Sequence, residues 1–311
     1  MWLLTFFVTG RFASFLAINY YTTTMKTLLI STDFSKHAKH AAEYGYNLAR
    51  QIKANIVLCN AVIVPAEAAQ AGLVVWPMEE SGELLYDSAR ELTHLKEHLE
   101  HANHTADFQP VISCINEPGI LTDVINQIIA SHEIGLVIIG THGNSGPSTF
   151  LLGNHSRNMI NDTTKPLLLV PPAAVIAPIK KIAFATDFKR PDHDQEAIYA
   201  LIPLARALNA GILLTHIDDE KDLSHQLKQR AEQFMIELSD KADYPNIYYR
   251  VVKNASAEKG LEWLCEHGQI DVLAMLHRSH NFFDNLLRGS HTQKMASHIA
   301  IPFLVFHGDS K

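Results

Sequence analysis

The chain carries two copies of one sequence pattern. The segment Leu28–Phe34 (LLISTDF) returns as Ile182–Phe188 (IAFATDF), and Lys165–Val170 (KPLLLV) returns as Ile301–Phe306 (IPFLVF). Each pair opens and closes a segment of about 130 to 145 residues. A repeat of that length has the size of a whole domain, so the sequence predicts one fold built twice in a single chain.

Composition narrows the class of protein. A length of 311 residues fits two ordinary domains, and 47% hydrophobic residues suffice for a buried core in each. The chain has 26 Lys and Arg against 33 Asp and Glu, a formal charge of −7. The sequence contains no run of Lys or Arg that could bind along a phosphate backbone, so we expect no nucleic-acid partner. Three cysteines occur, widely spaced and without a C-x-x-C motif. This usage argues against disulfides and structural zinc and predicts a cytoplasmic protein.

Residues 1–24 are expected to lie outside the fold as an extension. The stretch Met1–Val8 is apolar, but the basic residue Arg11 follows it, whereas a signal peptide has its basic residues first. The stretch is also too short to span a membrane, so we expect no membrane partner. We expect a first domain over residues 25–172, a proline-containing linker over 173–179 and a second domain over 180–311.

Short apolar runs alternate with longer amphipathic segments in both halves. Strands buried on both faces of a parallel sheet read as continuous apolar stretches, and the segments between them are long enough for right-handed helical crossovers. The pattern predicts an α/β fold with the order β-α-β-α-β-α-β-α-β in each half. The expected helices of the first half are Lys36–Lys53, Glu83–His101 and Ile120–Ser131. The expected strands are Thr27–Ser31, Asn55–Asn60, Gln109–Ile115, Leu136–Gly140 and Leu167–Val170, then Lys181–Ala185, Gly211–His216, Asn246–Val252, Val272–Leu276 and Phe303–Phe306.

One glycine-patterned segment of the first half could hold a phosphate. It runs from Gly140, at the end of an expected strand, through Gly143 to Gly153, at the start of an expected helix. Backbone N–H groups lack partners at a helix N-terminus, and glycines let a phosphate approach the backbone closely. Glycines also simply make loops, so the spacing alone is weak support.

The twin Thr-Asp-Phe strand ends, Gly-Thr-His-Gly at residues 140–143 and Leu-Leu-Gly at 151–153 resemble the universal stress protein family in its tandem two-domain form. The resemblance extends over residues 25–307. It implies five-stranded parallel sheets sandwiched by helices, a Rossmann-like fold of the adenine nucleotide alpha-hydrolase-like type. It also implies a nucleotide of the ATP type (ATP, ADP or AMP) at the carboxyl ends of the strands, with Mg²⁺ as an optional companion. The two domains are expected to pair as a dimer would, and a homodimer is a further option.

The resemblance assigns nucleotide-binding roles in the first half. Asp33 would face the ribose and adenine beside Ser31, and backbone groups of Ala61 would read the adenine edge. The residues expected around the ribose and phosphates are Ile139, Gly140, His142, Gly143, Gly153, Asn154 and His155. Asn154 departs from the family pattern, which has Ser or Thr there, although an amide can still donate to a phosphate.

The second half departs further from the pattern. Aligned by sequence, Met275 and Arg278 stand where Gly140 and Gly143 stand in the first half. Two side chains would then occupy the space of a phosphate, so the second site is expected to be filled and mainly structural. The alternative is that Arg278 binds an anion through its guanidinium group.

Other motifs carry less weight. The histidines at positions 94, 98, 101 and 104 share one helix stripe, which is expected to be a solvated face, with a surface metal site as the weaker alternative. No Walker, Gly-x-Ser-x-Gly or His-Glu-x-x-His motif occurs, and we assign no catalytic or metal-binding residue.

The function that these features favour is a nucleotide-binding sensor or regulator of the stress response. A slow ATP hydrolase or nucleotidyl-transfer enzyme on the same site, and a nucleotide-free scaffold for protein contacts, are the alternatives. In the architecture, the short apolar edge strands Leu167–Val170 and Phe303–Phe306 are candidates for covering one another at the domain junction.

Overall fold

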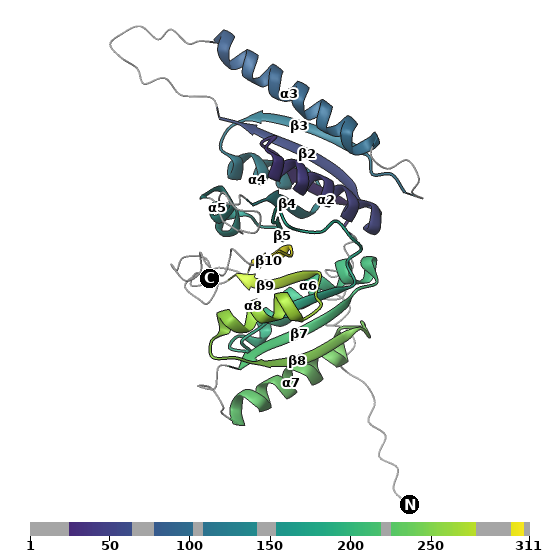
Figure 1. The fold of residues 1–311 in the computed structure, drawn as a ribbon, viewed down its shortest axis with the longest axis vertical. Coiled ribbons are helices and arrows are strands. Elements are labelled where there is room, and N and C mark those ends of the chain that lie inside the picture. The colour runs from purple at the N-terminus through teal and green to yellow at the C-terminus, as the bar shows by residue number, and fades with distance from the viewer. Residues whose placement is uncertain are drawn as a thin grey trace, which may run out of the picture.

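The structure is a computed structural model, and it describes residues 25–63, 78–101, 108–141, 154–218, 225–277 and 300–307. It has the predicted α/β fold (Figure 1). The first half consists of β1 (Thr27–Ser31), α2 (Lys36–Ile52), β2 (Asn55–Val62), α3 (Met78–His101), β3 (Ile112–Pro118), α4 (Leu121–Ser131), β4 (Ile134–Gly140), α5 (Asn154–Asp162) and β5 (Leu167–Val170). The second consists of β6 (Lys181–Ala185), α6 (Pro191–Leu208), β7 (Gly211–Asp218), α7 (His225–Lys241), β8 (Ile247–Lys253), α8 (Ala257–His267), β9 (Val272–His277) and β10 (Phe303–His307).

All ten strands form one sheet, in the order β3-β2-β1-β4-β5-β10-β9-β6-β7-β8. Within each half the neighbouring strands are parallel, and the sole antiparallel pair among them is β5 with β10. Read inward from either edge, the two halves have the same strand order. The repeat in the sequence is therefore a repeat of topology.

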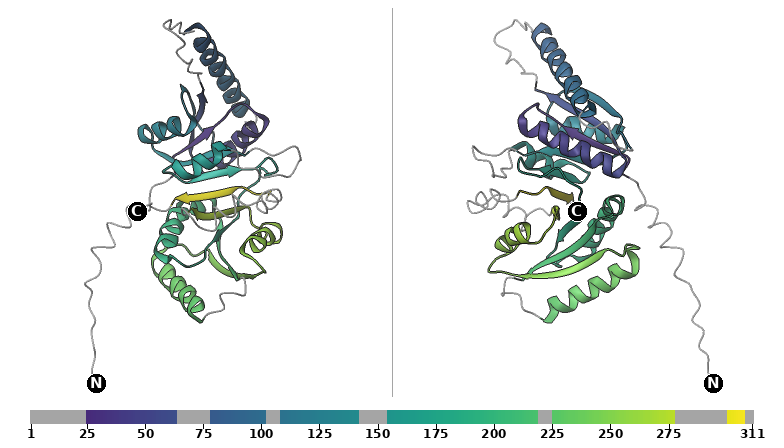
Figure 2. Two further views of the ribbon diagram at one scale, coloured as in Figure 1. Left: turned by 90° about the vertical axis from the view of Figure 1, so that its left-hand side faces the viewer. Right: turned by 45° about the vertical axis from the view of Figure 1, so that its right-hand side comes forward.

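The junction between the halves has the symmetry of a dimer. Leu168 pairs with Leu304, and these two residues hold the same position in the KPLLLV and IPFLVF repeats. A pseudo-twofold axis therefore passes between them, as it would between two copies of one subunit. Both leucines are buried. Figure 2 shows β10 lying beside β5, and the expectation that these edge strands cover one another is confirmed.

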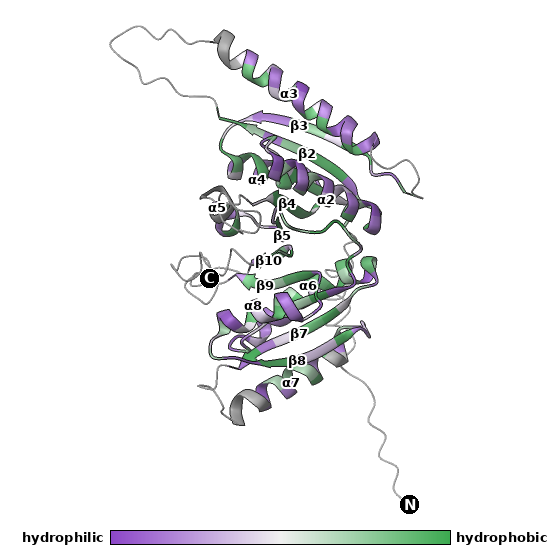
Figure 3. Cartoon of the chain, in the orientation of Figure 1, coloured by the Kyte–Doolittle hydropathy of each residue, from purple (hydrophilic) through white to green (hydrophobic). Residues whose placement is uncertain are grey.

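Helices cover both faces of the sheet. Helices α2, α3, α6 and α7 contribute to one buried apolar cluster, which we call the first face, and α4, α5 and α8 to the other, the second face. Each cluster contains residues of both halves, so the hydrophobic core runs through the junction on both sides of the sheet. Figure 3 shows the apolar strands at the centre and polar residues on the outer side of α3.

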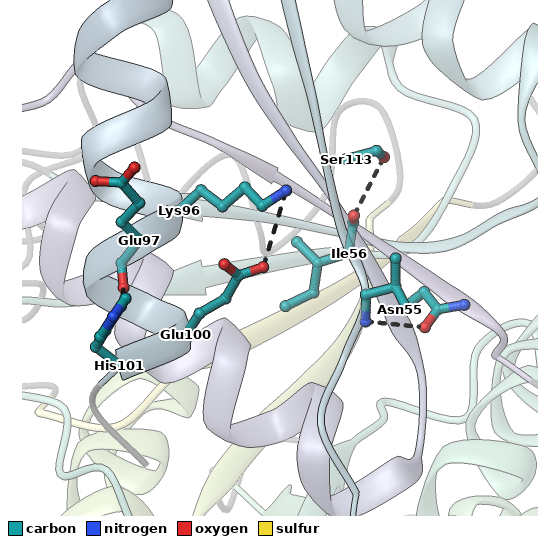
Figure 4. Close-up of polar contacts among 8 residues, drawn as sticks. Asn55, Ile56, Lys96, Glu97, Glu100, His101 and Ser113 are labelled. Atoms are coloured by element: carbon teal, nitrogen blue, oxygen red, sulfur yellow. Dashed lines mark hydrogen bonds and ion pairs between the residues drawn. The ribbon is translucent and has the colours of Figure 1, made fainter. Parts of the chain in front are cut away.

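Edge strand β3 lies further along the chain than the expected Gln109–Ile115. It pairs with β2 as far as Val62 with Pro118, and a proline is tolerated there because no further strand needs its N–H group. On its first-face side the Asn116 amide donates to the Leu85 carbonyl oxygen (2.9 Å) and to Ser88 Oγ (2.9 Å), which fixes α3 on the strand. Figure 4 shows the neighbouring Ser113 hydroxyl, which donates to the carbonyl oxygen of Ile56 (3.3 Å).

Candidate functional site

The turn that follows β1 presents Asp33 at the carboxyl edge of the sheet. The backbone N–H of Thr32 donates to the Cys59 carbonyl oxygen (2.9 Å), and its hydroxyl accepts from the Phe34 N–H (3.0 Å). Asp33 Oδ1 accepts from the Ser35 N–H (3.0 Å). Phe34 has a φ of 62°, a conformation that a bulky residue rarely adopts. The turn thus holds an exposed carboxylate in a fixed orientation at the edge where ligands of such sheets bind.

A second residue that supports this turn, Asn60, was not found by reasoning from the sequence. Its buried side-chain amide donates to the Thr32 carbonyl oxygen (2.7 Å) from the adjacent strand β2. Asn60 directly precedes Ala61, which is half-buried near the end of β2. The sequence did contain a signal for this role: a polar residue occurs at the same place in both repeats, inside an otherwise apolar strand. In β7 that residue is His216, whose Nδ1 lies 3.0 Å from the Thr186 carbonyl oxygen.

Gly140, at the end of β4, is where helix α2 approaches the sheet. A Cβ at this position would lie 2.8 Å from the His37 carbonyl oxygen and 3.2 Å from the Ala38 Cα. Both atoms belong to the backbone of the first turn of α2, which starts after Ser35 caps it by accepting from the Ala38 N–H (3.2 Å). The glycine therefore has a packing role, independent of any ligand, that the sequence did not reveal.

The structure gathers part of the predicted site on three adjacent strands. Strands β2, β1 and β4 are neighbours, so Ala61, Ser31, Asp33, Ile139 and Gly140 come together at one carboxyl edge. Ser31 and Ile139 are buried there. Asn154 and His155 are the first two residues of α5. His142, Gly143 and Gly153 lie outside the described residues.

The second half repeats the turn of the first half but encloses it. Thr186 accepts from the Phe188 N–H (3.0 Å), and Asp187 accepts from the Lys189 N–H (3.0 Å), as their counterparts do in the first half. Phe188, however, is only 1% exposed. Its ring centroid lies 5.6 Å from that of His216, 5.2 Å from Phe234 and 6.0 Å from Tyr249. These aromatic rings pack along one flank of the turn.

A buried acid reinforces this enclosed turn. The Thr186 hydroxyl donates to Asp194 Oδ2 at 2.6 Å, and Asp194, in the first turn of α6, is 1% exposed. A buried polar group is costly unless it is hydrogen-bonded, and this bond compensates for the burial of the carboxyl group. The network therefore locks the end of β6 to α6.

The strand register corrects the alignment of the two halves. Gly140 pairs with Val170 in β4–β5, and Leu276 pairs with Phe306 in β9–β10. Since Val170 and Phe306 are repeat equivalents, the counterpart of Gly140 is Leu276, and the proposed match with Met275 was wrong by one residue. Continuing along the sequence, Arg278 aligns with His142 instead of Gly143. The side chain that replaces Gly140 is thus the partly buried Leu276, packed against the first-face cluster.

The histidine stripe on α3 forms polar contacts. His98 Nε2 lies 3.0 Å from Glu43 Oε1 on α2, and His101 Nδ1 lies 2.7 Å from the Glu97 carbonyl oxygen. In Figure 4, Glu97 and His101 lie on a different side of α3 from Lys96, whose ammonium is 3.9 Å from Glu100. Across the described residues, no group of three or more His, Cys, Asp or Glu side chains is arranged to hold a metal.

The cysteines are free thiols. The apolar sequence runs around Cys59 and Cys114 predict that both thiols pack in the core. Cys59 is buried in β2, where burial raises the pKa of its thiol to about 12, and it packs as predicted. Cys114 was also expected to pack, but it is exposed on edge strand β3.

Of the helices that the structure describes, none has the length and apolarity to span a membrane.

Comparison with known proteins identifies the repeat. A model of the universal stress protein family matches residues 24–171 and 178–307. No curated protein matches the sequence. Among solved structures, a universal stress protein from Archaeoglobus fulgidus DSM 4304 is similar over 91% of this chain and 98% of its own, with a TM-score of 0.66 and 14% identity.

Two other structures share the fold over most of their length. A functionally unknown protein from Pseudomonas aeruginosa PAO1 covers 94% of this chain and 95% of its own, with a TM-score of 0.54 and 13% identity. The cytoplasmic domain of a prokaryotic cation chloride cotransporter covers 90% and 94%, with a TM-score of 0.53 and 12% identity. At these identities the likeness extends to the fold alone.

Proposed function

Because the chain belongs to the universal stress protein family, we propose that its first half binds an adenine nucleotide of the ATP type. The nucleoside would lie against Asp33 and Ala61, and the phosphates would extend toward the start of α5. The observation that carries the proposal is the turn after β1. Thr32 and Asn60 hold it by hydrogen bonds on both of its sides and present an exposed carboxylate at the edge where ligands of parallel sheets bind.

The proposal predicts one nucleotide per chain, because the two halves differ at this edge. Phe188 is buried in an aromatic cluster, and Leu276 replaces Gly140 in the second half. We propose that the second half serves as a structural partner of the first. The protein would then act as a sensor or regulator in the cytoplasm, and bound ATP would be turned over slowly or not at all.

The two aspartates of the repeat provide a matched test. Asp33 and Asp187 each accept a hydrogen bond of 3.0 Å from the backbone N–H two residues ahead. Replacing either with alanine therefore removes the same local contact. We expect Asp33→Ala to weaken ATP binding at least tenfold in calorimetry with and without Mg²⁺, a loss of about 1.4 kcal/mol or more. Asp187→Ala should leave the affinity unchanged.

Three outcomes would contradict the proposed function. Equal effects of the two substitutions would show that the carboxylate of the first half has no role in the ligand site. Turnover of ATP on the order of 1 per second, the rate of ordinary kinases, would favour the enzyme over the sensor. Absence of ATP binding by the unmodified protein would favour a scaffold.

A further inference from the structure

Two histidines of the second half hold a helix of the first half. His277 ends β9 and His307 ends β10, and the two are register partners whose ring centroids lie 6.4 Å apart. His277 Nε2 lies 3.1 Å from Asn161 Oδ1, and His307 Nε2 lies 2.7 Å from the Ile160 carbonyl oxygen. Both partners belong to the last turn of α5. The contact therefore crosses the pseudo-twofold junction.

The contact fixes which nitrogen of the neutral His307 ring carries its proton. A carbonyl oxygen can only accept, so Nε2 of His307 must carry the proton and donate it to Ile160. Nδ1 is then the unprotonated nitrogen. It is buried, and in the part of the chain that the structure describes it makes no hydrogen bond. A second proton on Nδ1 would place a positive charge in this buried position.

The surroundings of His307 disfavour its charged form. Burial lowers the pKa of His307 to about 4; the hydrogen bond to the Ile160 backbone opposes this shift, His277 on β9 adds a smaller lowering effect, and a backbone contact with Lys165 a smaller raising one. Two charged residues lie close in the sequence to the Ile160 backbone that His307 contacts: Asp162, at the end of α5, and Lys165, before β5. The neutral imidazole is therefore the form that fits the junction.

We propose that His307, supported by His277, is a proton-sensitive latch that ties α5 to the second half. We further propose that opening of the latch weakens ligand binding at the start of α5, a step that rests on the proposed nucleotide site. The helix begins with Asn154 and His155 and ends at Asp162. The nine residues of α5 span about 13 Å. So short a helix moves as a rigid body, so a displacement of its C-terminal end also displaces its N-terminal end.

Linkage gives the size of the effect. When the latch opens, His307 enters water and its pKa returns to about 6.5. At about pH 5, His307 is then protonated in the open state but mostly neutral in the closed state. The equilibrium constant for opening is therefore about 30-fold larger than at about pH 7.5. The coupling is reciprocal, so a ligand that favours the closed latch would lower the pKa of His307 further.

Hydrogen exchange of the α5 amides, without any nucleotide, tests the latch itself. His307→Gln keeps an N–H donor for the Ile160 carbonyl oxygen but cannot titrate in this range, and His307→Ala removes the donor. His267→Gln is the control, because His267 is exposed on α8 and contacts the carbonyl oxygen of Trp263 in its own helix (3.2 Å).

The latch predicts a distinct result for each protein. From about pH 7.5 to about pH 5, protection of α5, corrected for intrinsic exchange, should fall about 10- to 30-fold in the unmodified protein and in the His267 variant. It should stay constant in His307→Gln and be low at both pH values in His307→Ala. An equal fall in the unmodified protein and His307→Gln would overturn the latch.

ATP affinity tests the coupling to the site. Protonation of the nucleotide and of other histidines is common to all variants, so the informative quantity is the ratio of Kd at the two pH values. We expect a smaller ratio for His307→Gln than for the unmodified protein. Equal ratios would overturn the coupling. If the unmodified protein binds no ATP, the proposed function fails, while the exchange experiment still decides whether the latch exists.

Discussion

The substitution Gly140→Ala tests how closely α2 packs on the sheet. The added methyl group would lie 2.8 Å from the His37 carbonyl oxygen, 3.0 Å from its carbon and 3.2 Å from the Ala38 Cα. These are backbone atoms of a capped helix turn, so they cannot rotate away as a flexible side chain could. Either the first turn of α2 or the end of β4 must move. Overpacking of this kind reduces the free energy of unfolding by about 1–3 kcal/mol.

Gly82→Ala is the matched control for this change. Gly82 lies in α3, where an added Cβ would meet no atom within 4 Å. Alanine has the higher helix propensity, so this variant should gain about 0.5–1 kcal/mol. The same chemical change is thus expected to have opposite signs at the two positions. Urea unfolding should show a lower midpoint for Gly140→Ala and a slightly higher one for Gly82→Ala, with unchanged slopes.

Nucleotide affinity separates the two roles of Gly140. Because α2 starts directly after the turn that presents Asp33, a displaced first turn should also weaken ATP binding. A variant as stable as the unmodified protein would refute the close-packing argument. A destabilised variant with unchanged ATP affinity would restrict Gly140 to packing and remove it from the proposed site.

Four further outcomes are expected. Leu168→Asp places a charge in the buried strand junction and should lower the free energy of unfolding by more than about 3 kcal/mol in urea titrations. Asp194→Ala removes the acceptor of the 2.6 Å bond from Thr186 and should lose about 1–3 kcal/mol, while the exposed Asp192→Ala should stay within about 0.5 kcal/mol. The folded-state pKa of His307 is lowered to about 4, so the contribution of its neutral form to stability is complete above about pH 6.5. This contribution, up to about 3 kcal/mol, is lost as the pH falls toward 4. The melting temperature of His307→Gln should therefore depend less on pH than that of the unmodified protein. Calorimetry should give one ATP per chain, and two equivalent sites would contradict the filled second edge.

The sequence was sufficient for the elements that hydrophobic burial determines. Strands such as β1 and β6 have a continuous apolar, buried centre, and their predicted bounds match the observed ones. Edge strand β3 was displaced in the prediction because only its first residue is buried and its end is polar and exposed, which leaves little periodic signal. The apolar character of β5 and β10 also predicted their pairing, since two buried edges in one chain cover each other most simply.

The site was harder to predict because it depends on contacts between distant segments. Asn60 supports the Asp33 turn from an adjacent strand, and nothing in the local sequence shows which carbonyl its amide reaches. The alignment error at Met275 has a similar origin. Both Met275 and Leu276 are apolar, so composition cannot tell which one replaces Gly140, whereas a shift of one residue in a strand moves the side chain to the opposite face.

The pseudo-twofold junction explains how the halves can diverge at one edge and agree at another. Leu168 and Leu304 meet at equivalent positions, so each half needs the strand of the other to complete its core. The carboxyl edge of the second half is under no such requirement. There Phe188 is buried among aromatic rings, whereas its counterpart Phe34 is only partly buried, and Leu276 replaces Gly140. The same edge also supplies His277, whose counterpart in the first half is Thr141, to hold α5. The second half therefore retains the fold while its side chains at the carboxyl edge differ from those of the first half.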